Sequence, residues 1–426
     1  MEVKNHIKTC FLCLELAGLY TLALFMPFSE SIKWIGFALF LLGTMGRKVL
    51  SDPMKWRKPC TFEWFLIALF IAPLLSTLVN WPLPNGISGI KEIFVYLALG
   101  WLMSINHYTD KQLKYFLLSL IGGILVGLIL SAFDLVSGQN PFLEFKSIPN
   151  LNRSVIYHLM AIFTMGAMLL DNSGKFSTKL RIGVGICLVV SLGALIIMGS
   201  RAGIIALFMG VVLLFILFLS QLRVMITFFC GVVLLFLLTI GISSYIKIPA
   251  VQNRIDIFKY YYKLIKNGSV PTSPVMLSNR IRYDYIRVAW AQITQKGNIL
   301  FGSGPATFKY INVEALKFNP SLLEYKKNWN TLSHAHNAYL NLWVEQGLGG
   351  ISIYICFLIY LGVSLYRYRL KTEGIHWQWL ACLGFLNTAV VAGLFNTVLA
   401  NESAWQGMML TGIYIQGMKQ SGLLQS

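Results

Sequence analysis

Apolar runs of 16 to 24 residues recur along most of the chain, and this feature limits the possible folds more than any other. A helix of about 20 apolar residues is long enough to cross a bilayer. Charged residues make up only 12% of the chain, whereas soluble domains carry about 25%. The pattern predicts twelve spans, at residues 10–27, 31–46, 61–80, 87–107, 113–136, 154–170, 182–200, 202–221, 224–246, 336–366, 377–398 and 403–418. We therefore expect an all-α polytopic membrane protein with about twelve transmembrane helices, the first of them retained and not cleaved as a signal peptide.

Basic residues are distributed unevenly between the two ends of these spans. If the N-terminus is placed inside, seventeen of the 35 Lys and Arg residues fall in inside segments and only five in short outside loops. The positive-inside rule favours this orientation, because short cytoplasmic loops carry the excess of Lys and Arg. We therefore predict that both termini are cytoplasmic and that the long segment 247–335 lies outside.

The long outside segment is the one candidate for a separate domain. It divides the chain into an N-terminal bundle of about nine helices (1–246), a loop domain (247–335) and about three C-terminal helices (336–426). The loop holds thirteen Lys and Arg against four Asp and Glu, so it carries half of the net charge of +18. Such a surface attracts anions such as phosphorylated lipids, but a solvated basic loop without a ligand would have the same composition. Nucleic acid is excluded as a partner because the basic surface faces away from the cytoplasm.

Several motifs that hold metals or nucleotides are missing from the sequence. It contains no Walker A loop, no Asp-x-Asp pair and no His, Cys and Glu spacing typical of zinc sites. The seven cysteines lie in or beside the predicted spans and indicate no disulfide framework. Arg and Lys side chains can neutralise a diphosphate without a metal. We therefore expect chemistry without a metal or another cofactor.

The most informative pattern begins at His336. At 100° per residue, five residues would share one stripe of a helix: His336, Leu340, Trp343, Gly347 and Gly350. The histidine would lie at the outer end of this stripe, where an imidazole can take a proton from an attacking hydroxyl at ordinary pH. An interfacial histidine that only bonds a backbone carbonyl would show the same spacing, so spacing alone leaves both interpretations open.

The residues that follow His336 carry a resemblance to a known family. His336-Asn337, then nine residues, then Gly347, and Gly350 after two more, resembles the signature of the O-antigen ligase family. The number of spans and the large outer loop directly before the motif resemble that family as well. O-antigen polymerases and protein O-oligosaccharyltransferases share much of this pattern. The resemblance implies a GT-C-like glycosyltransferase architecture.

Two further segments resemble the same family. Gly199-Ser200-Arg201-Ala202-Gly203 looks like its Ser-Arg-small turn between two spans. The segment 278–282, followed by Trp290 and Gly302-Ser303-Gly304, looks like its loop segment with an essential arginine, which would be Arg280 or Arg282. Arg201 is also notable without the resemblance, because a guanidinium in a short break between two spans needs an anionic or carbonyl partner such as a lipid phosphate. Snorkelling to lipid headgroups is the alternative.

The resemblance implies a specific reaction. An O-antigen polysaccharide would be transferred from undecaprenyl diphosphate to the lipid A–core oligosaccharide, at the periplasmic face of the bacterial inner membrane. His336 would act as the general base on the acceptor hydroxyl, and direct attack would invert the anomeric carbon. Arg201, together with Arg280 or Arg282, would stabilise the charge on the departing diphosphate.

Three more residues are candidates for binding the donor. Lys91 enters a span beside Glu92, and Arg153 lies just before another span on the same face. Asn337 is the third, as the second residue of the signature. For Lys91 and Arg153, a general role in anchoring the helices at the membrane surface fits the sequence equally well.

Two other functions are compatible with the main features of the sequence. A polymerase that joins O-antigen repeats would carry similar motifs. A transporter or flippase would have a similar number of spans, but transporters often show internal repeats and ionisable groups at the bilayer midplane. The two halves of this chain show no convincing repeat, and the ionisable residues gather at the outer ends of the predicted spans. The sequence therefore favours an enzyme.

Overall fold

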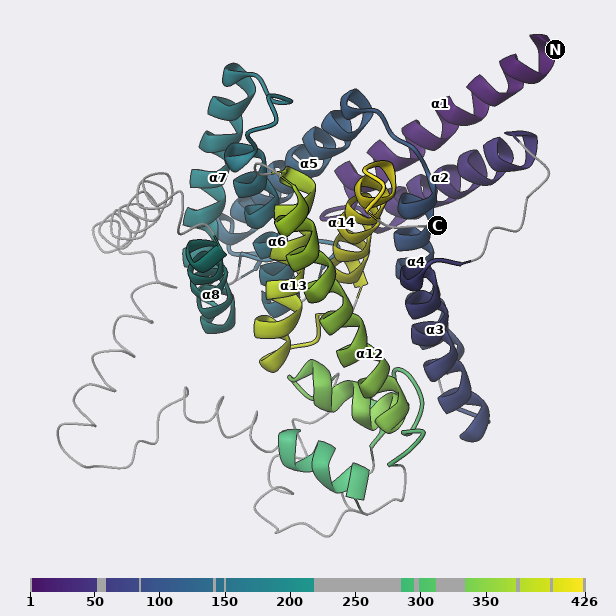
Figure 1. Ribbon diagram of the computed structural model, residues 1–426. Coiled ribbons are helices and arrows are strands. Elements are labelled where there is room, and N and C mark those ends of the chain that lie inside the picture. Colours follow the sequence, from purple (N-terminus) through teal and green to yellow (C-terminus); the bar gives the residue numbers. More distant parts are fainter. Residues whose placement is uncertain are drawn as a thin grey trace, which may run out of the picture.

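The computed structural model describes residues 2–51, 59–83, 86–140, 143–148, 151–217, 285–294, 299–311, 334–372, 376–398 and 401–423. Within these ranges the chain forms helices and connecting turns and no strand (Figure 1). The longer helices are α1 (Glu2–Phe25), α2 (Glu30–Ser51), α3 (Thr61–Val79), α4 (Gly86–Ile105), α5 (Asp110–Val136), α6 (Leu151–Leu170), α7 (Thr178–Met198), α8 (Arg201–Leu217), α12 (Ala338–Lys371), α13 (Trp377–Val391) and α14 (Asn401–Gln420). The prediction of an all-α protein is confirmed for these residues.

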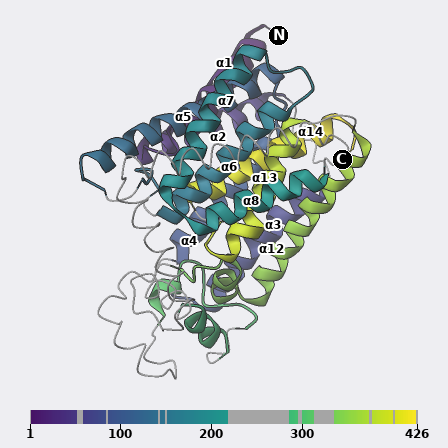
Figure 2. The ribbon, with the colours of Figure 1, turned by 90° about the vertical axis from the view of Figure 1, so that its left-hand side faces the viewer.

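Successive helices run in alternating directions, so their connections gather at the two ends of one bundle (Figure 2). We call the end that carries the start of α12 the outer end. There the hydroxyl of Ser403, at the start of α14, lies 3.5 Å from the carbonyl oxygen of Arg153, at the start of α6. The opposite or inner end carries the beginning of α1 and the end of α14, where the Lys419 ammonium donates to the carbonyl of Ser104. Both described chain ends thus lie at the inner end.

Glycines allow close contact between helix backbones in this bundle. In the α1–α2 hairpin, a Cβ atom on Gly18 would lie 2.7 Å from the carbonyl oxygen of Gly36, and one on Gly36 would lie 2.7 Å from the backbone nitrogen of Leu22. Between α14 and α4, a Cβ on Gly412 would lie 2.5 Å from the carbonyl oxygen of Gly100. These helix pairs therefore pack through the small residues that are typical of helix contacts in membranes.

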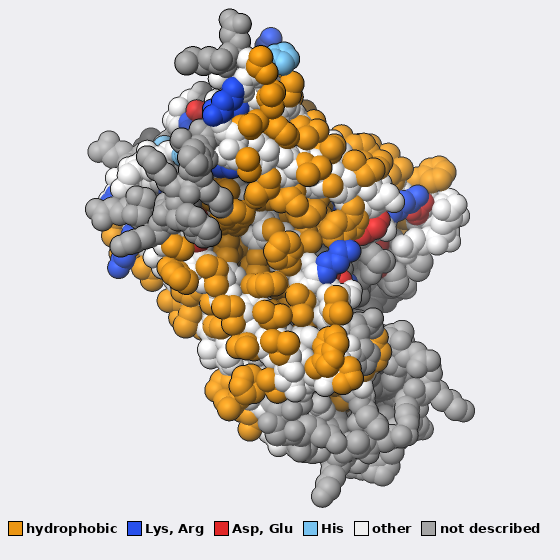
Figure 3. All heavy atoms as spheres, turned by 90° about the vertical axis from the view of Figure 1, so that its right-hand side faces the viewer, with side chains coloured by type: hydrophobic (Ala, Val, Ile, Leu, Met, Phe, Trp, Pro, Cys, Tyr) orange, Lys and Arg blue, Asp and Glu red, His pale blue; other side chains and the backbone are white. Residues whose placement is uncertain are grey.

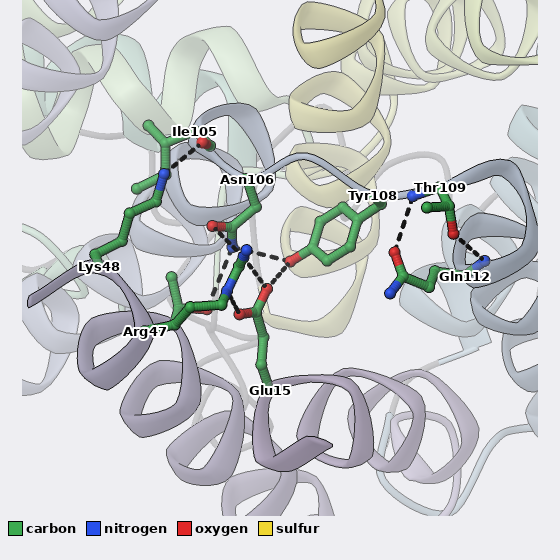
Figure 4. Close-up of polar contacts among 9 residues, drawn as sticks. Glu15, Arg47, Lys48, Ile105, Asn106, Tyr108, Thr109 and Gln112 are labelled. Atoms are coloured by element: carbon green, nitrogen blue, oxygen red, sulfur yellow. Dashed lines mark hydrogen bonds and ion pairs between the residues drawn. The ribbon is translucent and has the colours of Figure 1, made fainter. Parts of the chain in front are cut away.

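A buried charged network holds the α1–α2 hairpin to the connection between α4 and α5 at the inner end (Figure 4). The Glu15 carboxylate is fully buried and accepts two hydrogen bonds from Arg47, from Nε at 2.7 Å and from a terminal nitrogen at 2.9 Å. The Tyr108 hydroxyl donates to the same carboxylate at 2.8 Å, and Arg47 also donates to the Asn106 side chain. Burial, followed by the nearby Glu15 charge, raises the pKa of Tyr108 well above its usual range, so the hydroxyl keeps its proton and donates.

The lengths and composition of the helices fit a membrane protein that crosses the bilayer several times. Eight helices in the described part of the chain are long and apolar enough to cross a membrane, and α8 is apolar but shorter. Hydrophobic side chains cover most of the face of the bundle in Figure 3. The predicted span 224–246 and the boundary at residue 246 lie outside the described residues. The total of twelve spans and the division into three domains therefore stay predictions.

Candidate functional site

The start of α12 differs from the helix that the sequence predicts. His336 has a positive φ of 51° and Asn337 is extended, so the helix begins at Ala338. Asn337 is the N-cap: its side-chain oxygen accepts a hydrogen bond from the backbone nitrogen of Leu340 at 2.9 Å. The predicted start of this helix at residue 336 was therefore two residues too early. His336 lies in the turn before the helix, at the outer end of the bundle.

A kink at Gly347 interrupts α12, and the two parts of the helix run in different directions (Figure 1). Gly347 has φ 68° and ψ −169°, which no helical residue adopts. The kink frees backbone carbonyls from the helix. Those of Val344 and Glu345 accept hydrogen bonds from the backbone nitrogens of Ser303 (2.7 Å) and Gly304 (2.8 Å). The prediction that one continuous stripe runs from His336 to Gly350 is therefore wrong, because the helix bends to bind the segment 299–304.

Two glycines allow the segment 299–304 to cross the kink. Gly302 has φ +70°, and a Cβ atom there would lie 2.5 Å from the backbone nitrogen of Gly347. A Cβ atom on Gly347 would collide with the carbonyl oxygen of Leu300. A positive φ and a backbone contact at the same position both require glycine. Gly347 of the signature and Gly302 of the loop are thus both needed for the two backbones to come this close.

Replacing Gly347 by alanine should therefore destabilise the outer end. Strain at a positive φ costs about 1–3 kcal/mol, and the collision with Leu300 adds overpacking of about 1–3 kcal/mol. We expect a lower midpoint of thermal unfolding in detergent. Gly349→Ala is the matched control, because its Cβ would lie 3.9 Å from the nearest atom, the carbonyl oxygen of Leu300. Equal midpoints for the two variants would contradict the role given to Gly347.

The imidazole of His336 is packed between two other rings. The ring of Tyr285, from the helical segment 285–294, stacks on it with centroids 5.2 Å apart and an angle of 27°. The ring of His334 lies on it with a centroid distance of 4.4 Å. His334 is itself buried, and its Nε2 is 2.9 Å from the side-chain oxygen of Asn396. His336 is half-buried, so these two rings do not cover it completely.

Arg201 is the first residue of α8, and its side chain is exposed. Gly199 ends α7 in the left-handed conformation with φ 64°, which allows the sharp turn into α8. The Ser200 hydroxyl accepts from the backbone nitrogen of Gly203 at 3.4 Å. A Cβ atom on Gly203 would lie 2.5 Å from the side chain of Val155, so the first turn of α8 is beside the first turn of α6. This contact places Arg201 at the outer end.

Arg153 and Lys91 also lie at the outer end, each beside groups of another helix. Arg153 is half-buried in the first turn of α6 and interacts electrostatically with Glu92 of α4 and Glu402 of α14. The exposed Lys91 ammonium lies 4.6 Å from the centre of the Trp34 ring. The positive charge of Arg153 is thus partly balanced by carboxylates.

A buried ion pair between Lys33 and Glu402 supports this arrangement, and sequence reasoning did not find it. Each residue is only 3% exposed, and Lys33 also forms an ion pair with Glu30. Lys33 and Glu402 are 369 positions apart in the chain. The glutamate interacts with Arg153 as well, so the pair links α2, α6 and α14 at the outer end.

An apolar cavity lies between α6, α7, α8 and α13. Phe163, Leu192, Leu214 and other apolar side chains line it, and Asn387 is the polar residue among those described around it. The Asn387 amide already donates to the carbonyl of Ala206 at 2.7 Å. The cavity is therefore suited to a hydrocarbon group and runs beside the helix that starts at Arg201. In the described ranges, no three His, Cys, Asp or Glu side chains come together as ligands for a metal.

The structure brings five of the predicted site residues to one end of the bundle: Lys91, Arg153, Arg201, His336 and Asn337. The short 3₁₀ helix η5 (Ala392–Leu394) contacts both α8 and α12, and so connects the elements that carry Arg201 and His336. Asn337, also at this end, donates from its side-chain nitrogen to the carbonyl of Leu394 at 3.1 Å. Both polar atoms of Asn337 therefore contact the backbone, and a contact with a donor stays a prediction. Arg280 and Arg282 lie outside the described residues.

One part of the chain matches a known protein family. Residues 186–355 match the family model described as O-antigen ligase. The chain carries an O-antigen ligase domain. The family that the sequence motifs predict is thereby confirmed. No curated protein matches the chain. The ligase domain runs from α7 into α12 and includes Arg201, His336 and both glycines of the crossing, whereas Lys91 and Arg153 precede it.

Proposed function

We propose that the protein transfers O-antigen polysaccharide from undecaprenyl diphosphate to the lipid A–core oligosaccharide, at the periplasmic face of the bacterial inner membrane. The observation that carries this proposal is that an imidazole and several cations of different helices share the outer end of the bundle. The ligase domain supports the reaction class. The outer end would face the periplasm, and both termini would be cytoplasmic.

In the proposed reaction the acceptor hydroxyl oxygen attacks the anomeric carbon of the donor sugar. The bond between that carbon and the diphosphate oxygen breaks, and its electron pair leaves with the diphosphate. His336 takes the hydroxyl proton as the general base. Arg201, together with Arg280 or Arg282, stabilises the charge that develops on the leaving diphosphate. Attack from the side opposite the diphosphate inverts the configuration at the anomeric carbon.

The donor has a charged head and a long hydrocarbon chain, and the protein offers groups for both. Arg201 would bind the diphosphate, and Lys91, Arg153 and Asn337 are further candidates for donor contacts. The apolar cavity beside α8 could hold part of the prenyl chain. We expect this chemistry to need no metal, because guanidinium groups such as that of Arg201 can bind two phosphate oxygens at once.

Arg201→Ala should raise the KM for the lipid-linked donor, and Arg201→Lys should raise it less. Hydrogen bonds to charged groups contribute about 1.5–3 kcal/mol, which corresponds to roughly 10–100-fold. A lysine keeps the charge but loses the paired geometry of the guanidinium. The measurement is the initial rate of purified protein in detergent at several donor concentrations. Lys179→Ala, which removes one exposed charge at the inner start of α7, is the control. Equal KM values in all variants would contradict a diphosphate role.

A lipopolysaccharide gel from a deletion strain tests the proposal against its closest alternatives. Loss of a ligase leaves the bare core, whereas loss of a polymerase leaves core capped by one repeat. Loss of a protein O-oligosaccharyltransferase leaves the lipopolysaccharide unchanged. Formation of a new glycan linkage by purified protein separates all three enzymes from a transporter, since transport makes no bond.

A further inference from the structure

The orientation of the Asn396 side chain is fixed by a backbone group. Its oxygen accepts a hydrogen bond from the backbone nitrogen of Thr397 at 2.9 Å. A backbone nitrogen can only donate, so the atom that faces it must be the amide oxygen. The same oxygen lies 2.9 Å from Nε2 of His334. The Nε2 atom of His334 therefore carries a proton and donates, which restrains the orientation of this ring.

The fixed ring of His334 in turn limits where the imidazole of His336 can lie. Their centroids are 4.4 Å apart, and Tyr285 stacks on His336 at 5.2 Å. His336 also has a left-handed backbone with φ 51°, a conformation that costs roughly 1–2 kcal/mol for a residue with a Cβ atom. Its orientation therefore depends on its neighbours and not on the preference of its own backbone.

Hydrogen bonds between α12 and the end of α13 hold these partners in register. The side chain of Asn337 donates to the carbonyl of Leu394, and the hydroxyl of Tyr339 donates to the carbonyl of Val390 at 3.2 Å. Asn396 lies two residues after η5 and is only 1% exposed, so it is packed in place close to these contacts. The turn after α13 is thus a rigid support for the residues before α12.

We propose that Asn396 and His334 are positioning residues that orient the imidazole of His336 toward the acceptor hydroxyl. This inference rests on the proposed function, in which His336 is the general base. Asn396 fixes the His334 ring through its oxygen, and the His334 ring fixes that of His336 by contact. A base that is misplaced by about 1 Å loses rate without losing substrate affinity.

The test compares the loss of the Asn396 amide with the loss of another buried amide. Asn396→Leu should lower kcat about 10–100-fold, the size typical of lost supporting hydrogen bonds, and leave both KM values within about twofold. Asn106→Leu is the matched control, since it also removes a buried asparagine with side-chain hydrogen bonds, but at the inner end, opposite His336. It should keep its kcat at a temperature where both variants are folded.

Asn396→Asp provides a rescue. Its carboxylate keeps an acceptor for Thr397 and for His334, and the Nδ2 atom that it replaces has no hydrogen-bond partner among the described residues. We expect at least a tenth of the wild-type kcat in this variant. Full kcat in Asn396→Leu, or equal losses in Asn396→Leu and Asn106→Leu, would overturn the positioning role.

These results are distinguishable from a failure of the proposed function. If His336→Ala is inactive and Asn396→Leu is fully active, the general base stands and the positioning role is wrong. If His336→Ala keeps its activity, His336 is not the general base and the proposed mechanism is wrong, whereas a purified wild-type protein that forms no glycan linkage would contradict the proposed function itself. His334→Phe, which keeps a ring of similar size but cannot donate to Asn396, should behave like Asn396→Leu.

Discussion

His336→Ala should lower the rate of glycan transfer by about 10²–10⁴-fold, the usual effect of removing a general base. The loss should appear in kcat, because the imidazole acts on the acceptor hydroxyl in the transition state and contributes little to binding the ground state. The protein should still insert and fold. The side chain is only half-buried, and the N-cap of α12 is supplied by the neighbouring Asn337.

Initial rates with purified protein and lipid-linked donor provide the measurement, and thermal unfolding of each variant reports on the fold. His376→Ala is the matched control, since this half-buried histidine precedes α13 at the inner end and its side chain does not cap the helix. Near-normal transfer by His336→Ala would exclude the residue as the base. A similar loss in the control would assign the effect to folding.

Arg47→Met should lower the free energy of unfolding by about 3–5 kcal/mol, because it leaves the Glu15 carboxylate buried without its main partner. The Tyr108 hydroxyl and water cannot replace two hydrogen bonds from a guanidinium. Thermal or denaturant unfolding in detergent measures the change. Transfer activity at low temperature should stay close to that of the wild type, since the pair lies at the end opposite His336.

The double variant Glu15→Leu/Arg47→Met tests the reason for this loss. Replacing both members of a buried ion pair by apolar groups is often neutral or even stabilising. The double variant should therefore recover most of the stability that Arg47→Met loses. If the double variant is less stable than Arg47→Met, the cost does not come from an unpaired carboxylate.

The sequence predicted the parts of the fold that depend on local pattern. Apolar runs of about twenty residues predicted the long helices, and the Gly-Ser-Arg turn correctly separated α7 from α8 at Gly199. The limits of this approach appear at Gly347. Glycine is common at helix contacts in membranes, so its presence did not indicate a kink. The kink depends on backbone hydrogen bonds with the segment 299–304, which lies more than forty residues earlier in the chain.

The candidate site was also predicted only where its residues belong to a local pattern. His336 and Arg201 belong to short motifs, and the alternation of spans was enough to assign them to one side. The bond between His334 and Asn396 joins positions 62 apart, and the Lys33–Glu402 pair joins positions 369 apart. No local pattern predicts such pairs. A second histidine two residues before His336, in a stretch that does not form a helix, was the signal that could have indicated a paired imidazole.

The crossing of Gly302 and Gly347 has a consequence for protein engineering. Each segment supplies hydrogen-bond donors for acceptors on the other, and each has a glycine where the other has a backbone atom. A chimera could import only the segment 299–304, or only α12, from another ligase. The two segments would then come from different proteins, and their backbone contacts would not match. Exchange of 285–355 as a single cassette keeps the two segments together, and is the design we expect to yield an active hybrid.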